Sequence, residues 1–109
     1  MAGTFTGKPL ADGQVASSKG TLYTVPASTV AYVRSASFHN TNAATQTLIV
    51  YANVSGTSRI IGYATLAQHE TYYLTTGGEA IVLAAADLIE AVTTTATAVD
   101  YLITGLEET

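Results

Sequence analysis

The chain has 109 residues, the length of one domain, and it has no cysteine, which excludes disulfide bonds and thiolate metal sites. Only 11% of the residues are charged and the net charge is −4. Nucleic-acid interfaces need clustered cations, and the four here are scattered: Lys8, Lys19, Arg34 and Arg59. We therefore expect no nucleic-acid partner. We also identify no secretory signal, and no run of roughly 18 apolar residues that could span a membrane.

Residues 1–19 differ in composition from the rest of the chain. They are rich in Gly, Ser, Ala and Lys, and they contain Pro9 and the turn signal Asp12-Gly13. We interpret them as an extended N-terminal arm of low intrinsic order before a β domain over residues 20–109. The residues of this arm that we expect to make assembly contacts are Thr4, Phe5, Lys8, Pro9 and Leu10. Deleting the arm should then weaken assembly and leave the fold intact.

From Gly20 onward, short apolar stretches alternate with turn signals. They predict eight strands, over residues 21–25, 30–39, 46–54, 59–66, 69–75, 80–83, 88–94 and 98–104. A spacing of roughly 8–12 residues is typical of sandwiches and barrels. We therefore predict an all-β fold, an antiparallel β-sandwich of about eight strands with a jelly-roll or Ig-like Greek-key topology.

Several strands carry more detailed signals. The run Leu48-Ile49-Val50-Tyr51 is typical of a strand buried on both faces, and Gly62 predicts a bulge. Gly77-Gly78 predicts a turn, and the last two strands are expected to form a hairpin with each other. In the second of these, alternation places three apolar side chains on one face: Val99, Tyr101 and Ile103.

No catalytic, cofactor or metal constellation is found. The two histidines, His39 and His69, are 30 residues apart without a metal-binding spacing or an orienting partner. Asp87 and Glu90 should point to opposite faces of a strand, which does not suit paired acid–base work. We expect the carboxylates to be solvated loop and edge charges: Asp12, Glu70, Glu79, Asp87, Glu90, Asp100, Glu107 and Glu108. The protein is therefore predicted not to be an enzyme.

Nearly every predicted strand carries an aromatic residue, most often tyrosine. Tyrosines could stack on sugar rings, but we expect most of them to pack in the core and on sheet faces, and the absence of tryptophan argues further against a sugar platform. The low charge is also informative, because free domains usually carry roughly 25–35% charged surface. The deficit has two explanations: Thr and Ser hydroxyls that keep the surface hydrated, or surface that neighbouring subunits cover, which is the interpretation we favour.

Three stretches resemble small virion proteins of tailed bacteriophages. Residues 20–27 read GTLYTVPA, residues 33–41 read VRSASFHNT and residues 100–108 read DYLITGLEE. The resemblance spans roughly residues 20 to 108 and implies a β-sandwich without catalytic residues. It also implies a virion location, after synthesis in the cytoplasm of the host bacterium.

The leading hypothesis is a capsid decoration, or cement, protein that stabilises the phage head. Its implied partners are copies of itself, in a homo-oligomer such as a trimer, and the major capsid protein. Two alternatives come from the tail: a component of the fibre or baseplate, and a module that binds a surface glycan or receptor. A small hydrolase is a third class, which would require a hydroxyl, a histidine and a carboxylate to converge in a cleft.

Overall fold

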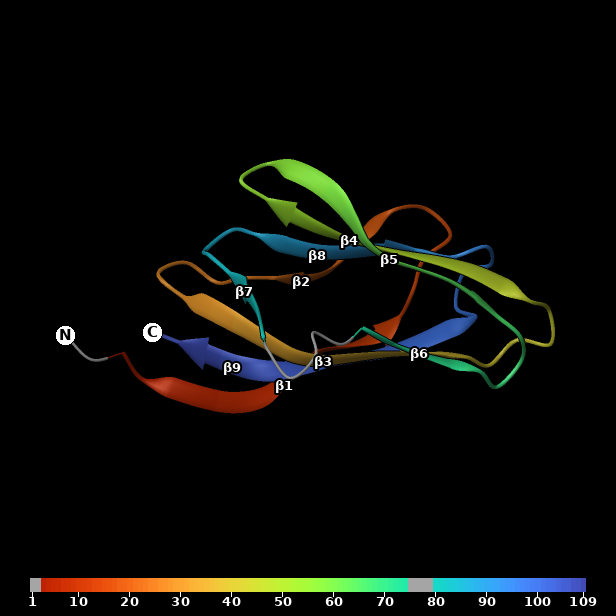
Figure 1. The fold of residues 1–109 in the computed structure, drawn as a ribbon, viewed down its shortest axis with the longest axis horizontal. Coiled ribbons are helices and arrows are strands. Elements are labelled where there is room, and N and C mark those ends of the chain that lie inside the picture. Colours follow the sequence, from red (N-terminus) through yellow and green to blue (C-terminus); the bar gives the residue numbers. More distant parts are fainter. Residues whose placement is uncertain (1–2, 75–79) are drawn as a thin grey trace.

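The computed structural model describes residues 3–74 and 80–109, which form two antiparallel sheets packed face to face (Figure 1). The strands are β1 (Phe5–Gln14), β2 (Gly20–Thr24), β3 (Val30–Asn40), β4 (Gln46–Val54), β5 (Thr57–Leu66), β6 (Thr71–Leu74), β7 (Ile81–Leu83), β8 (Leu88–Val92) and β9 (Val99–Glu108). The predicted all-β antiparallel sandwich is therefore confirmed. The molecule is elongated, with extents of 50 × 25 × 22 Å.

The strand order identifies the topology as a jelly roll. One sheet runs β1-β9-β3-β6, with β7 also paired to β3, and the other runs β2-β8-β4-β5. The strands pair as nested partners around the β4–β5 hairpin: β4 with β5, β3 with β6 and β7, β2 with β8, and β1 with β9. This nesting is what results when one long hairpin is rolled into two sheets, and it is the arrangement of jelly rolls rather than of Ig-like domains.

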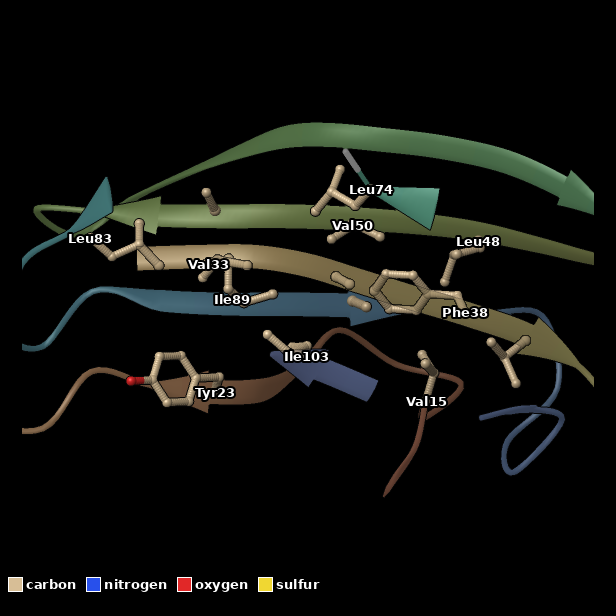
Figure 2. Packing of buried hydrophobic residues seen from close by; sticks show 14 of the residues in the cluster. Val15, Tyr23, Val33, Phe38, Leu48, Val50, Leu74, Leu83, Ile89 and Ile103 are labelled. Atoms are coloured by element: carbon tan, nitrogen blue, oxygen red, sulfur yellow. The ribbon is translucent and has the colours of Figure 1, made fainter. Parts of the chain in front are cut away.

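The core lies between the sheets and is built from alternate residues of each strand. Phe38, Leu48 and Ile103 are fully buried, and Figure 2 shows these side chains converging between the two layers. Phe38 also packs against two tyrosines, with ring centroids 6.3 Å from both Tyr72 and Tyr101. The expectation that most tyrosines serve packing holds for these rings.

The strand β4 has the predicted bounds but differs from the prediction in burial, and β5 begins two residues before its predicted start at Arg59. From Gln46 to Asn53, β4 alternates between buried and half-buried residues, so it has one buried face and not the two that its apolar run predicted. The predicted bulge is confirmed: the pairing register shifts opposite Val50 and Tyr51, which leaves Ile61 unpaired beside Gly62. Ser55 and Gly56 join the strands with positive φ angles of 53° and 84°, as in a tight type I′ turn.

The predicted hairpin of the last two strands is wrong, because β8 and β9 belong to different sheets. The segment between them crosses from one layer to the other. The predicted alternation in β9 is confirmed, since Val99 and Ile103 are buried and Tyr101 is half-buried. The strand also continues beyond Thr104 to Glu108. The turn expected at Gly77-Gly78 lies outside the described residues.

The N-terminal segment is part of the sandwich, which corrects the expectation of a loose arm before residue 20. β1 pairs with β9 along its length, and Val15 is fully buried in the core. At its start, Thr4 and Thr109 exchange two backbone hydrogen bonds of 2.9 and 3.0 Å. This segment is an edge strand with one exposed face, and the composition of such a strand, considered alone, resembles that of a coil.

Gly105 marks the closest approach between β9 and β3. It is buried, and a Cβ at this position would collide with the backbone carbonyl of Tyr32. The β3 register shifts between Val33 and Ser35 at the same place, so Arg34 is an extra residue in a bulge. The bulge and the glycine together allow the two backbones to stay paired here.

Candidate functional site

The described residues do not gather groups that suggest catalysis or metal binding. No cluster of three or more histidines and carboxylates lies within metal-binding reach in residues 3–74 and 80–109. No pocket is found in that part of the chain either. None of those residues form a helix that could cross a membrane. The candidate site is therefore a surface, and the residues that the sequence singled out are the place to start.

Three carboxylates expected to be solvated are instead buried: Asp87, Glu90 and Glu107. Asp87 accepts backbone hydrogen bonds from Ser55 and Ala84 at 3.2 and 3.0 Å, so it joins two loops. Glu90 accepts a 2.8 Å bond from the Ser58 hydroxyl. The bonds from Ser55 and Ser58 bring together residues about 30 positions apart, and a sequence pattern has no means of showing them.

Glu107 is at the centre of a polar cluster at one end of the core. It points inward from β9, where it accepts a 2.5 Å hydrogen bond from the Tyr23 hydroxyl and forms a 2.8 Å ion pair with Lys8. The hydrogen bond from Lys8, helped by that from Tyr23, holds the pKa of Glu107 below its ordinary value. Burial, together with the bond to Glu107, raises the pKa of Tyr23. The cluster therefore fastens β1, β2 and β9 to one another.

The contacts within the sandwich determine which of the predicted assembly residues remain available to contact another molecule. Lys8 is engaged by Glu107, and Leu10 packs against the core. Thr4 is bound to the backbone of Thr109, and Pro9 lies opposite Thr104 beside a bulge. Phe5 is exposed on the outer face, with its ring 5.9 Å from that of Tyr32. Phe5 is the only one of the five with a large exposed hydrophobic side chain, and it points outward.

The outer face around Phe5 combines aromatic and acidic groups. Tyr32 donates a 2.8 Å hydrogen bond to Glu108, and this bond raises the pKa of Tyr32. Phe5 and Val30 both lie opposite Glu108 in the register of β1-β9-β3. Phe5, Val30, Tyr32, Leu106 and Glu108 thus share one face, and we name them the Phe5 face.

The two histidines, distant in sequence, lie together in the structure. The rings of His39 and His69 are stacked with centroids 5.9 Å apart, and Nδ1 of His39 lies 2.8 Å from the Thr71 hydroxyl. His69 adopts a positive φ of 68° and its backbone N–H donates to the Asn40 carbonyl. The pair joins the end of β3 to the loop before β6. Sequence spacing missed it because the two segments meet only through the fold.

Exposed apolar side chains gather along one edge of the sandwich. Five of the eight large hydrophobic side chains exposed among the described residues belong to β5, β6 and β7. We name them the apolar edge: Ile60, Ile61, Tyr63, Tyr73 and Val82. Tyr63 and Tyr73 are both more than 60% exposed, but they belong to different sheets.

Comparisons with known proteins place the fold but not a family. A scan of family models found no match, and a search of curated proteins found no relative. Among solved structures, a chain from the crystal structure of the IBDV viral particle matches with a TM-score of 0.55 at 10% sequence identity. The match covers 99% of this chain and 31% of that chain. At this identity, the likeness shows a shared β-sandwich fold, over about a third of the length of the other chain.

Proposed function

We propose that this protein is a non-enzymatic structural component of a virus particle. The observation that carries the proposal is the match of nearly the whole jelly roll to part of a chain from a viral particle, at a TM-score of 0.55. Jelly rolls are a common building unit of viral capsids. The described residues, in which the buried carboxylates serve structural contacts, add no chemistry that would favour an enzyme.

Within that role, we propose decoration of the head of a tailed bacteriophage. The three sequence stretches that resemble phage virion proteins lie on β2, β3 and β9, in the centre and at one edge of the sandwich. The partners would be the major capsid protein and other copies of the chain. Weak contacts repeated by the symmetry of a shell can add up to firm attachment through a high effective concentration.

The Phe5 face is the surface that we assign to the shell. Phe5 is exposed and next to Tyr32, and aromatic side chains are enriched where proteins contact each other. Of the remaining predicted contacts, Lys8 and Leu10 hold β1 against the sandwich and so act on the shell only by positioning Phe5. The tail module that binds a glycan lacks a comparable observation, because the two most exposed tyrosines lie on different sheets.

The test is a binding experiment with expanded phage shells that lack the protein. The purified protein should sediment with the shells and raise the temperature at which they release their contents. The Phe5→Ser variant should bind at least about tenfold more weakly, as expected for loss of an aromatic anchor. The control is Val54→Ser, an exposed apolar residue at the end of β4, which should bind normally. Absence of binding by the unchanged protein would exclude decoration.

A further inference from the structure

The four edges of the two sheets are not equally able to accept another strand. β1 contains Pro9, which has no backbone N–H, and a register shift follows it. β2 has five residues and a register shift of its own, while β6 and β7 have only four and three residues. Short strands, prolines and bulges are the usual devices that prevent pairing at an edge. The fourth edge, β5, is ten residues long.

The second half of β5 is a regular strand with a free side. Gly62 to Leu66 stay in unbroken register with β4, from Gly62 opposite Val50 to Leu66 opposite Gln46. β4 is the only strand of the described chain with which β5 pairs. At the end of this segment the Asn40 side chain donates a 2.9 Å hydrogen bond to the Leu66 carbonyl, which marks where the free edge ends. Exposed N–H and C=O groups on such an edge form a template for a further strand.

Charge indicates what that further strand is. The protein is acidic, with eight carboxylates and four cations, so most of its surfaces repel another copy. No carboxylate lies on β5, and residues 60–68 carry no formal charge. The outward side chains here include Tyr63, which is 63% exposed, next to Ile60 and Ile61. A neutral strand with apolar side chains complements this edge, and the second half of β5 of another copy is such a strand.

We propose that β5 pairs antiparallel with β5 of a second copy, about a two-fold axis near Ala64. The two four-stranded sheets would then become one continuous sheet of eight strands, with Tyr63 of one copy opposite Thr65 of the other. Such an isologous contact closes on itself and gives a dimer. The pairing deepens the proposed structural function and rests on it, because it names the surface through which copies associate.

A cysteine cross-link tests the register directly, since the natural chain has no cysteine. The two thiols that an Ala64→Cys variant introduces would face each other across the axis, within the Cα distance of roughly 4.4–6.8 Å that a disulfide allows. Mild oxidation should yield a covalent dimer. The control is Thr6→Cys, on the exposed part of the opposite edge strand β1, which should remain monomeric. An Ala64→Cys variant without cross-links, or equal cross-linking of both variants, overturns the proposal.

Sedimentation of the protein without added cysteines provides the second measurement. At about 100 μM, the unchanged protein should have twice the 11.3 kDa mass of the chain. Tyr63→Lys places a cation on the shared edge and should raise the dimer dissociation constant by about tenfold or more. Phe5→Lys changes an aromatic residue of similar exposure on β1 and should leave the dimer intact. A monomer, a trimer, or a dimer that only Phe5→Lys disrupts would overturn the pairing.

Shell binding separates this inference from the proposed function. If the protein is monomeric in solution but still binds shells, the β5 pairing fails and the decoration role stands. If Ala64→Cys forms the expected dimer but the protein ignores shells, the pairing stands and decoration fails. The two surfaces are also distinct, since the Phe5 face belongs to the first sheet and β5 to the second.

Discussion

The two long edges of the sandwich differ in how well their outermost strands are protected against pairing with another strand. At one edge, β1 and β2 are joined to β9 by the Lys8–Glu107–Tyr23 cluster, and both carry register shifts. At the other edge, β5 ends in a regular neutral segment, and the strands β5, β6 and β7 expose five large apolar side chains. An open sandwich must protect its edges against unwanted pairing. Because β1, β2, β6 and β7 carry such protection and β5 does not, β5 is the strand that remains available for contact.

Deleting residues 1–19 is the most severe way to break the protected edge. The sequence suggested that the fold would survive, but the structure shows that this deletion removes β1 and the fully buried Val15. We expect the shortened chain to lose cooperative unfolding, because the contacts that it lacks contribute a large part of the total stability, which is typically about 5–15 kcal/mol. Circular dichroism during heating measures this. Deletion of only the first three residues is the control, and folding of the long deletion would restore the arm interpretation.

Gly105→Ala attacks the same edge from inside, by disturbing the strand to which β1 is paired. The new Cβ would collide with the Tyr32 carbonyl, so β9 and β3 would have to separate at the bulge. The expected loss is about 2–4 kcal/mol in the free energy of unfolding by urea. Gly7→Ala is the matched control, because its Cβ would meet only the flexible end of Leu106, at 3.2 Å. Equal losses in the two variants would contradict the explanation.

The polar cluster should make the protected edge sensitive to acid. The pKa of Glu107 is lowered in the folded protein, so its charged form contributes stability above the ordinary value of 4.5. That contribution disappears as the pH falls through the lower folded value. At pH 7, Glu107→Gln should cost about 1–2 kcal/mol, the lower part of the range for hydrogen bonds to a charged group, because the partner Lys8 is half-exposed. The difference from the unchanged protein should shrink as the pH falls below the ordinary pKa of 4.5.

Urea titrations at neutral pH and at a pH well below the ordinary glutamate pKa would measure this change. Tyr23→Phe is a useful companion variant, since it keeps the buried ring and removes only the hydroxyl that donates to Glu107. A cost of Glu107→Gln that stays the same at both pH values would show that charge at this position does not stabilise the edge.

The smallest effect is expected from Pro9→Val, which would make the protected edge more like β5. The substitution adds a backbone N–H to an exposed strand and changes few packed atoms, so the stability should change by less than about 0.5 kcal/mol. Self-association should nevertheless increase, because the edge gains a donor. Light scattering as a function of concentration would detect it. Unchanged association would show that the bulge after Pro9 alone protects β1.

The sequence predicted local features well and long-range ones poorly. The bounds of β4 and the bulge beside Gly62 follow from alternation and glycine placement, which are local signals. The partners of each strand do not, and β8 and β9 were paired wrongly because nearness in sequence favoured a hairpin. In a jelly roll the outer nested partners lie far apart along the chain, as Phe5 and Glu108 do.

The candidate surfaces show the same limit. The composition of residues 1–19 led us to expect contacts from Phe5, Lys8 and Leu10. Phe5 is exposed, but Lys8 and Leu10 face the sandwich. Glu107 was interpreted as a solvated charge, since nothing near it in sequence announces Tyr23 or Lys8 as partners. Tyr63 could not be singled out, because only the strand order shows that β5 lies at an edge.

The hydrogen bonds between Thr4 and Thr109 have a practical consequence for protein engineering. Both ends of the described chain leave the sandwich at the same pole (Figure 1). A peptide or a fluorescent domain fused to either end would therefore start from one place. A short linker between the two ends would also permit circular permutation, with new termini opened at the Ser55–Gly56 turn.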